Sequence, residues 1–355
     1  MGFDSVLGGR RYPTVIRFGR IGDMIMLTAL LDLLHQRYGE PCQVIGSGVW
    51  NEEVYRGHPD IAHVWSFPRH TPFALSLTWP RVVWALRRTA PAPIYVAELY
   101  PRQLPRVRRL LATSGIDARR CLFITDEPTH EEEYWWERLQ RFGERTPPAV
   151  RVGAPNALPT DRVFAPRVKV SDSEREACDA WLRSRGWSGR DLILVQPGNA
   201  RTMSKRNEQW RRLNADDKAW PLERWVELVR RVHARRPEAV ILLRGFGREM
   251  PVLNEIRAAA DLPAVVAVEV ALRPLFALCE RSHSMISVDT GPAHAAAALG
   301  LPLVVLYGSE SPRRWLPRSA TGSPVMAVGG PPQSTRADQQ SVEAVFDAWC
   351  AFSPC

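Results

Sequence analysis

An acid, a hydroxyl, a glycine and a histidine stand close together in one short segment, ISVDTGPAHAAAALG at residues 286–300. They are Asp289, Thr290, Gly291 and His294. The apolar run before Asp289 predicts a buried strand, and the Ala-rich run after it predicts a helix. A helix N-terminus offers free N–H groups and partial positive charge, so the turn predicts an anion site. An ordinary helix cap explains the same residues, and the segment alone does not decide between the two.

A second turn with chemical potential is GRIGD, which runs from Gly19 to Asp23. It lies between a predicted strand at 14–18 and a predicted helix at 24–38. A carboxylate held there could act as a general base toward a hydroxyl. It could equally cap the helix, whose dipole favours an acid at that end. The nucleotide fingerprint GxGxxG and the P-loop lysine motif are both absent from the sequence.

Two further turns carry charged residues next to predicted helix starts. Lys218 lies in DDKAWP, ahead of a helix predicted from Leu222, and offers a mobile cation to an anion. Glu249 follows the glycines of GFGRE and could accept hydrogen bonds from a ribose. The alternatives are a solvated loop around Lys218 and a first-turn acid at Glu249 that the helix dipole favours.

Other reaction chemistries lack their signatures in the sequence. The eight histidines are isolated, and neither HExxH nor a DxD triplet is present, so we expect no metal site. No GxSxG elbow indicates a serine hydrolase. The six cysteines form no CxxC pair, which favours free thiols in a reducing cytoplasm. No run reaches the about 20 apolar residues of a membrane-spanning helix, so we expect no transmembrane segment.

The chain is basic, with 47 Lys and Arg against 38 Asp and Glu and a net charge of +9. This excess favours an anionic partner: nucleic acid, an anionic membrane surface or a phosphorylated substrate. A generally Arg-rich surface would give the same balance. We expect no nucleic acid as partner, because basic and aromatic residues do not interleave on a recognisable recognition module.

Strand and helix patterns alternate twice along the chain, which predicts two doubly wound α/β halves. A proline-rich stretch at residues 146–170 separates them. We therefore expect an N-terminal domain at 1–170, a C-terminal domain at 171–340 and a terminal helix within 341–355 that packs back on the N-terminal domain. Ligands of such sheets bind at the carboxyl ends of the strands. The GRIGD, QPGN, GFGRE and VDTGPAH turns lie at predicted strand ends, and in a two-lobed protein they could face one cleft.

Taken together, five segments resemble the family of ADP-heptose:lipopolysaccharide heptosyltransferases, glycosyltransferase family 9. They occur in the order expected for that family and extend over about residues 13–318. The segments are RFGRIGDMIMLTAL, GHPDIAHVW, PGN at 197–199, DDKAWPLERW and SVDTGPAHAAAALGLPLVVLYG.

The resemblance implies a GT-B fold, in which two facing Rossmann-like doubly wound domains enclose a cleft. The N-terminal domain would bind the acceptor and the C-terminal domain the nucleotide sugar. The implied reaction is inverting and metal-independent, needs no cofactor, and moves a heptose from ADP-heptose to a hydroxyl of a lipopolysaccharide core acceptor. Asp23 would be the general base, and Lys218 would neutralise the departing diphosphate.

The resemblance also implies which side chains bind the donor. Glu249 would hold the ribose, Asp289 the hydroxyls of the transferred sugar, and the helix start at Thr290 the phosphates. The family's hydroxyl residues before the lysine are replaced here, so only Asn214 could substitute, with Arg201 or Lys205 as other candidates. The expected donor-binding residues are Asn199, Asn214, Lys218, Glu249, Asp289, Thr290, Gly291 and His294.

Acceptor recognition is where this chain departs most from the family, over residues 98–120. The implied partner is an anionic glycolipid acceptor, with the protein cytoplasmic and peripheral on the cytoplasmic face of the inner membrane. The alternatives are a glycosyltransferase of this fold acting on a protein or a secondary metabolite, and a non-catalytic nucleotide-sugar-binding protein. The expected acceptor-binding residues are Gly22, Arg20, Arg102 and Arg106.

Overall fold

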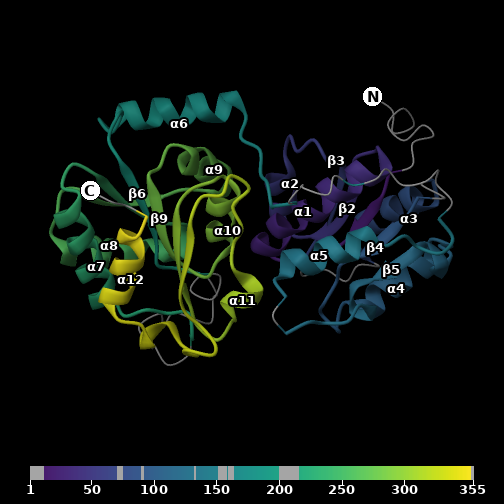
Figure 1. Cartoon of the computed structure of the whole chain (residues 1–355). Helices are drawn as coiled ribbons and strands as arrows, with labels where there is room; N and C mark the ends of the chain where they lie inside the picture. The colour runs from purple at the N-terminus through teal and green to yellow at the C-terminus, as the bar shows by residue number, and fades with distance from the viewer. Residues whose placement is uncertain are drawn as a thin grey trace. The chain divides into compact units, whose positions relative to one another are not determined.

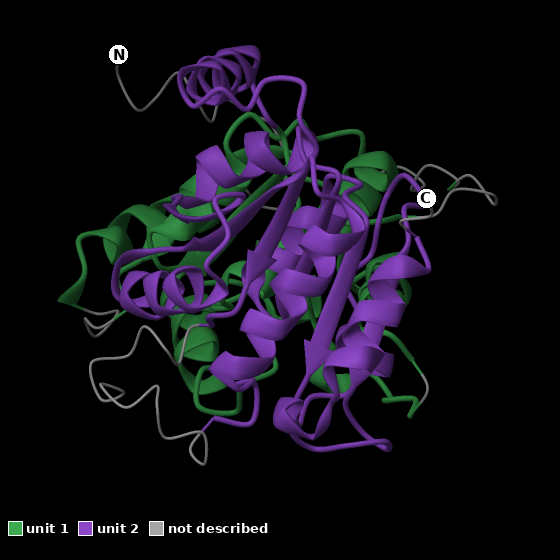
Figure 2. Ribbon diagram, turned by 90° about the vertical axis from the view of Figure 1, so that its left-hand side faces the viewer, with its two compact units in different colours: residues 1–169 green, residues 170–355 purple. Residues whose placement is uncertain are grey.

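A computed structural model describes residues 12–69, 75–88, 92–131, 133–150, 158, 164–199 and 216–352. The chain divides into two compact units, residues 1–169 and residues 170–355 (Figure 2). Each unit has its own sheet and its own apolar core, so each is described by itself.

In the described part of unit 1, a five-stranded parallel sheet has the order β3-β2-β1-β4-β5. The strand order reverses at β1 and β4, which makes the carboxyl ends of these two strands the switch point. The strands are β1 (Thr14–Ile16), β2 (Cys42–Ser47), β3 (Ile61–Phe67), β4 (Ile94–Val96) and β5 (Cys121–Phe123). The helices are α1 (Ile21–Tyr38), α2 (Trp50–Tyr55), α3 (Thr78–Arg88), α4 (Leu104–Thr113) and α5 (Trp135–Glu144), with short 3₁₀ turns η3 (Ala118–Arg120) and η4 (Ile124–Asp126).

Helix α1 is apolar around most of its circumference and is correspondingly buried. It begins at Ile21, three residues before the predicted start, because Arg20 serves as N-cap. Asp23 is therefore the third helical residue, and its carboxylate accepts the Arg20 N–H in a capping box. The helix ends at Tyr38 and is capped by Gly39, whose φ of 69° is the left-handed conformation that glycine adopts readily.

In unit 2, the described residues form a six-stranded parallel sheet with the order β11-β10-β9-β6-β7-β8. Its switch point lies between β6 and β9. The strands are β6 (Leu192–Gln196), β7 (Val240–Gly245), β8 (Val265–Glu269), β9 (Ser284–Val288), β10 (Leu303–Tyr307) and β11 (Val325–Gly329). The sequence prediction ended with β10, and the half-exposed edge strand β11 was missed.

Figure 1 shows helices on both faces of this sheet, with α7, α8 and α12 on one side and α9 and α10 on the other. This is the doubly wound arrangement that the alternating sequence pattern predicts. The helices are α6 (Asp172–Ser184), α7 (Leu222–Arg235), α8 (Met250–Ala260), α9 (Leu272–Glu280), α10 (Gly291–Ala298), α11 (Pro312–Trp315) and α12 (Val342–Cys350), with 3₁₀ turns η6 (Gly247–Glu249) and η7 (Ala337–Gln339).

The terminal helix α12 packs on α7, β10 and β11 of unit 2. Val345 and Trp349 are fully buried in the core of that unit, and the Trp349 indole N–H donates to the Ser284 hydroxyl at 2.9 Å. Apolar residues of α12 therefore complete the unit 2 core, and packing of the terminal helix on the N-terminal domain stays a prediction.

Candidate functional site

At the switch point of unit 2, the segment after β9 carries Asp289 and the segment after β6 carries Asn199. The Asp289 carboxylate forms an ion pair with Lys218, whose Nζ lies 2.5 Å from Oδ2. Both side chains are mostly buried, with 17% of Lys218 and 9% of Asp289 exposed. The structure thus brings together two residues predicted for the donor site that are 71 positions apart in the chain.

Two neighbouring acids fix the backbone around Lys218. Asp216 accepts hydrogen bonds from the Asn199 amide at 2.8 Å and from the Lys218 N–H at 3.1 Å. Asp217 accepts from the Ser309 N–H at 2.8 Å and from the Ser309 hydroxyl at 2.6 Å. The segment is therefore anchored on both sides of the lysine, which holds the cation at the strand ends.

Helix α10 begins directly after Asp289. Thr290 is its N-cap residue in extended conformation, and no side-chain hydrogen bond caps the helix. The Asp289 carboxylate is bound to Lys218, so an ordinary acid cap does not account for it. Gly291 starts the helix and leaves first-turn N–H groups without intrahelical partners, while His294 is buried in the same turn. The arrangement presents a cation, an acid and a helix N-terminus together.

Glu249 lies at the carboxyl end of β7 and is 5% exposed. Its carboxylate accepts the Phe246 N–H at 2.9 Å and the Gln196 amide at 3.3 Å. A Cβ on Gly198 would lie 1.9 Å from Glu249 Oε1, so only glycine allows this approach of the PGN turn. Gln196 is held in turn by Arg244, whose buried guanidinium has its pKa lowered by desolvation despite the nearby Glu249 charge.

At the switch point of unit 1, Asp23 is paired with a buried arginine that the sequence analysis did not select. Arg17 NH2 donates to Asp23 Oδ1 at 2.7 Å, and its NH1 lies 3.5 Å from Glu98 Oε1 after β4. Arg17 is 1% exposed and Glu98 fully buried, while 10% of the Asp23 side chain is exposed. Burial by itself would lower the Arg17 pKa, but the charges of Asp23 and Glu98 outweigh it and raise that pKa.

These contacts hold the Asp23 carboxylate in one orientation. One oxygen accepts from Arg17 and the other from the Arg20 N–H at 2.8 Å. Glu98 is held likewise, because it accepts the N–H groups of Phe18 and Tyr100 at 2.8 and 2.7 Å. The result is an oriented and slightly exposed carboxylate at the strand ends, a geometry that suits a general base.

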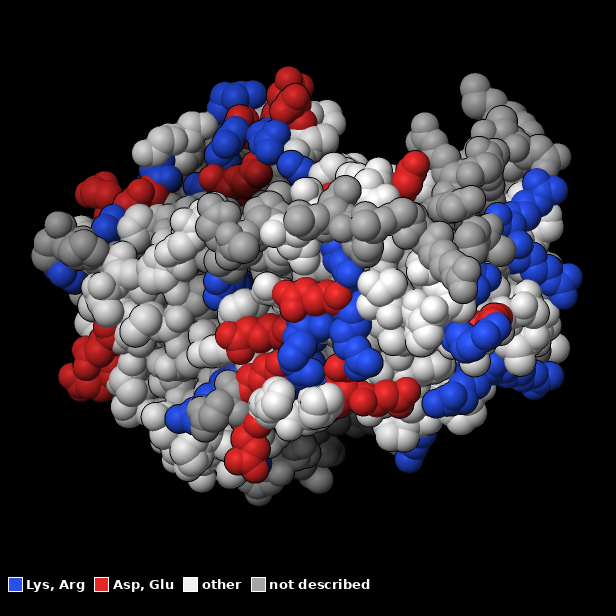
Figure 3. All heavy atoms as spheres, turned by 45° about the vertical axis from the view of Figure 1, so that its right-hand side comes forward, with Lys and Arg blue, Asp and Glu red and all other residues white. Residues whose placement is uncertain are grey.

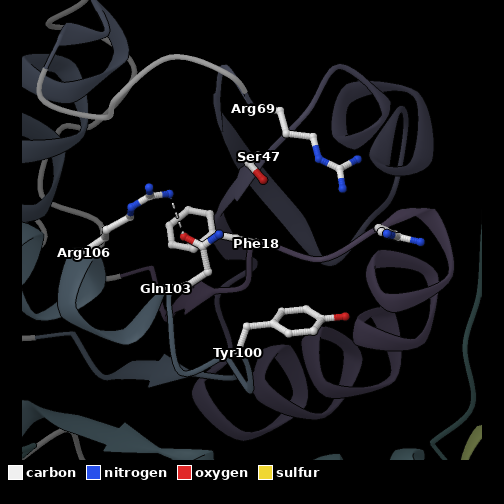
Figure 4. Close-up of a pocket in the computed structure, with 7 residues that line it drawn as sticks. Phe18, Ser47, Arg69, Tyr100, Gln103 and Arg106 are labelled. Carbon is white, nitrogen blue, oxygen red and sulfur yellow. Dashed lines mark hydrogen bonds between the residues drawn. The ribbon is translucent and has the colours of Figure 1, made fainter. Parts of the chain in front are cut away.

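A pocket of about 230 Å³ opens in unit 1 (Figure 4), and Tyr100 is among its lining residues. Arg69 and Arg106 approach it from opposite sides, with Phe18 and Ser47 between them. The pocket lies at the carboxyl ends of β1, β2, β3 and β4. Its lining residues are Phe18, Arg20, Ser47, Arg69, Tyr100, Gln103 and Arg106.

Two of the four predicted acceptor-binding residues line this pocket, and the other two do not. Arg20 and Arg106 line the pocket, whereas Arg102 is exposed outside the lining and Gly22 is buried within α1. Asn214, with Arg201 and Lys205, lies outside the described residues. The sequence analysis missed a set of residues now seen beside the predicted ones, namely Arg17, Glu98, Arg69, Tyr100 and Asp216. The sequence did offer a signal for Arg17, because it is a charged residue inside the apolar run TVIRF.

Over the residues that the structure describes, no cluster of three or more His, Cys, Asp or Glu side chains is placed to hold a metal ion. None of the helices in the same ranges combines the length and apolarity needed to cross a bilayer.

The two parallel α/β sheets define a GT-B protein. The fold matches that of the Escherichia coli ADP-heptose lps heptosyltransferase II with a TM-score of 0.69 and 19% identity, over 96% of this chain and 98% of that one. A glycosyl transferase family 9 structure from Veillonella parvula gives a TM-score of 0.74 with 15% identity, over 96% and 97%.

Sequence comparison finds similarity to one family over part of the chain. Residues 207–345 match the model of glycosyltransferase family 9 (heptosyltransferase), which confirms the resemblance inferred from the motifs. Lipopolysaccharide heptosyltransferase 3 of E. coli is 32% identical over 133 residues, 37% of this chain and 35% of that protein. Lipopolysaccharide core heptosyltransferase OpsX of Haemophilus influenzae is 28% identical over 102 residues, 28% and 29%. The match thus spans about a third of the length of these curated relatives.

Proposed function

We propose that this protein is an inverting glycosyltransferase that moves a heptose from ADP-heptose to a hydroxyl of a lipopolysaccharide core acceptor. The observation that carries the proposal is the Lys218–Asp289 pair beside the start of α10, inside the region that matches the family. It combines a cation and N–H groups for a diphosphate with an acid for sugar hydroxyls. The relatives named as heptosyltransferases support the choice of sugar.

The donor would bind at the switch point of unit 2. Glu249 would accept from the ribose, and Asn199 would anchor the segment that carries Lys218. The N–H groups around Thr290 and Gly291 would bind the phosphates, with His294 in the same turn. As the bond between sugar and diphosphate breaks, Lys218 and these N–H groups would stabilise the negative charge on the departing ADP. On this proposal that charge stabilisation needs no metal ion.

The acceptor would bind in unit 1, where Asp23 is the base. The acceptor hydroxyl gives its proton to the Asp23 carboxylate as its oxygen forms a bond to the anomeric carbon. The bond from that carbon to the diphosphate breaks on the opposite face, so the configuration inverts and ADP leaves. Atoms and charge balance without a further reactant.

Arg17 acts in this proposal as a positioning residue, because it contacts Asp23 rather than substrate. Its guanidinium is fixed by Glu98, by the Ala97 carbonyl at 3.2 Å and by the ring of Tyr100 at 5.3 Å. A guanidinium held in place in this way keeps the neighbouring carboxylate aligned.

We propose an anionic glycolipid as acceptor and a peripheral position on the cytoplasmic face of the inner membrane. The exposed arginines of unit 1 support this, and Figure 3 shows basic side chains gathered on its surface. Arg20 and Arg106 are the acceptor-binding candidates that the pocket favours, with Gly22 and Arg102 as weaker ones.

A panel of nucleotide sugars tests the donor assignment. A ligand that binds only the folded protein raises its melting temperature. ADP-heptose should raise it more than UDP- or GDP-linked sugars, and the gain should shrink in a Lys218→Met variant. A stronger effect of a UDP or GDP sugar would overturn the donor assignment. Donor binding without release of ADP in the presence of acceptor would favour a non-catalytic binding protein.

A further inference from the structure

The last residues of unit 1, 164–169, contact helix α1 and lead directly into unit 2. We call residues 164–169 the connecting segment. The Arg167 N–H donates to the buried Thr28 hydroxyl at 2.8 Å, and the Arg167 guanidinium lies 3.3 Å from the buried Asp32 carboxylate. Polar contacts from α1 therefore fasten the connecting segment to unit 1.

A histidine from the motif GHPDIAHVW, which the proposed function does not use, lies at the same place. His58 is buried, with 1% of its side chain exposed, and the Arg167 backbone is close enough to act on its pKa. Its Nε2 has no hydrogen-bond partner in the part of the chain that the structure describes. The cost of burying this ring therefore depends on how the connecting segment lies against it.

Charged groups from the neighbouring elements face His58. Asp60 places Oδ2 3.5 Å from Nδ1 of His58, and its Oδ1 lies 2.7 Å from Nδ1 of His35 on α1. The other titratable groups are Asp32 on α1, Lys169 on the connecting segment and the Cys42 thiol on β2 beside Asp60. Two histidines therefore share one carboxylate next to the connecting segment.

The neutral form of His58 fits this environment better than the charged form. The Asp60 N–H donates to Nδ1 at 3.4 Å, so Nε2 carries the proton of the neutral ring. Burial lowers the pKa of His58 below its ordinary 6.5, and the opposing effects of Asp60 and the Arg167 backbone do not outweigh it. A second proton would remove the Nδ1 acceptor and bury a charge. Protonation therefore favours a state in which water reaches the ring.

We propose that His58 is a proton-sensitive latch: the neutral ring holds the connecting segment on α1, and the protonated ring releases it. Release breaks the contacts of Arg167 with Thr28 and Asp32 and frees the chain that leads into unit 2. The latch is independent of the proposed function, because neither the donor site nor Asp23 enters the argument. Failure of one leaves the other untouched.

Hydrogen exchange of the Arg167 amide in the full-length protein tests the latch, because that N–H is protected only while the segment is closed. The closed state has the lower His58 pKa, so closure is complete above about pH 6.5 and weakens as the pH falls through the pKa of the closed state. After correction for intrinsic exchange, the opening constant should rise by up to about tenfold per pH unit below 6.5, the effect of one proton.

His58→Gln keeps an amide N–H near the position of Nε2 but cannot be protonated, so its opening constant should not change with pH. Two matched controls should keep the pH dependence. His35→Gln alters the other histidine on Asp60, and His63→Gln alters a half-buried histidine on β3 whose pKa burial also lowers.

An NMR titration of the parent protein needs no substitution and should show the His58 ring still mostly neutral at pH 6.5. Three results would each overturn the latch. They are a pH-independent opening constant in the parent, a pH dependence that survives in His58→Gln or disappears in His35→Gln, and a His58 ring already half protonated at or above pH 6.5.

Discussion

Lys218 and Asp289 form an ion pair at the switch point of unit 2, with Nζ 2.5 Å from Oδ2. Without a donor, each charge is neutralised by the other in a mostly buried site. A bound diphosphate would compete with Asp289 for the lysine, while sugar hydroxyls would donate to the released carboxylate. The pair would therefore hold the two groups proposed to bind the donor in position before the donor arrives.

Lys218→Met should lower kcat/KM by about 10²–10³-fold, the usual cost of losing a group that stabilises developing charge. The affinity for ADP should fall as well, because the diphosphate loses its cation. Release of ADP in a coupled assay and calorimetric titration of ADP measure the two effects. Lys169→Met, at an exposed position in unit 1, is the matched control and should leave both unchanged. Activity of Lys218→Met within a few-fold of the parent would remove the lysine from the mechanism.

Gly198→Ala should raise the KM for the donor. A Cβ there would lie 1.9 Å from Glu249 Oε1, so the carboxylate must move from its place. Steady-state kinetics at varied donor concentration measure the change. Adding Glu249→Asp shortens the acid by one methylene and should restore part of the affinity if the clash is the cause. No change in KM for Gly198→Ala would contradict a role of Glu249 in donor binding.

Arg17→Met should destabilise unit 1 by about 3–5 kcal/mol, since it leaves buried carboxylates without their counter-charge. The double variant Arg17→Met/Glu98→Gln should lose less than the sum of the single effects, because one uncompensated charge is removed with the arginine. Urea unfolding of the parent, both single variants and the double variant measures the coupling. Additive losses would show that the two side chains do not act as a pair.

Glu174 predicts an acid-sensitive contribution to the stability of unit 2. Burial alone would raise its pKa, but hydrogen bonds from Arg273 and Ser171 outweigh this and lower the pKa to about 2, from 4.5. The folded pKa is below the unfolded one, so the contribution is present above pH 4.5 and is lost as the pH falls toward 2. Glu174→Gln should lower stability at pH 7 and flatten its decline over that range in urea unfolding. An unchanged pH profile would contradict the assignment.

The sequence predicted much of the fold because strand and helix periods alternate clearly in both units. The turns with Asp23 and Asp289 were found because parallel strands place their carboxyl-end turns at one edge of the sheet. The sequence did not predict that Asp23 pairs with Arg17 or that Asp289 pairs with Lys218. These ion pairs depend on side-chain contacts, which the strand and helix pattern does not specify.

Other features were missed for the same physical reason. Glu98 reaches Arg17 across 81 positions of the chain, and no local pattern signals that contact. Edge strand β11 has only one neighbour and exposed residues, so its apolar pattern is weak. The terminal helix was predicted correctly, but a helix pattern does not specify the surface on which Trp349 packs.

The central claim is that Asp23 takes the acceptor proton, and Asp23→Asn tests it most directly. The substitution keeps the size of the side chain and removes the base, so kcat should fall by about 10²–10⁴-fold, the usual contribution of a general base. The affinity for ADP should stay unchanged, since the donor would bind in unit 2. A kcat within a few-fold of the parent, with ADP still bound, would contradict the account.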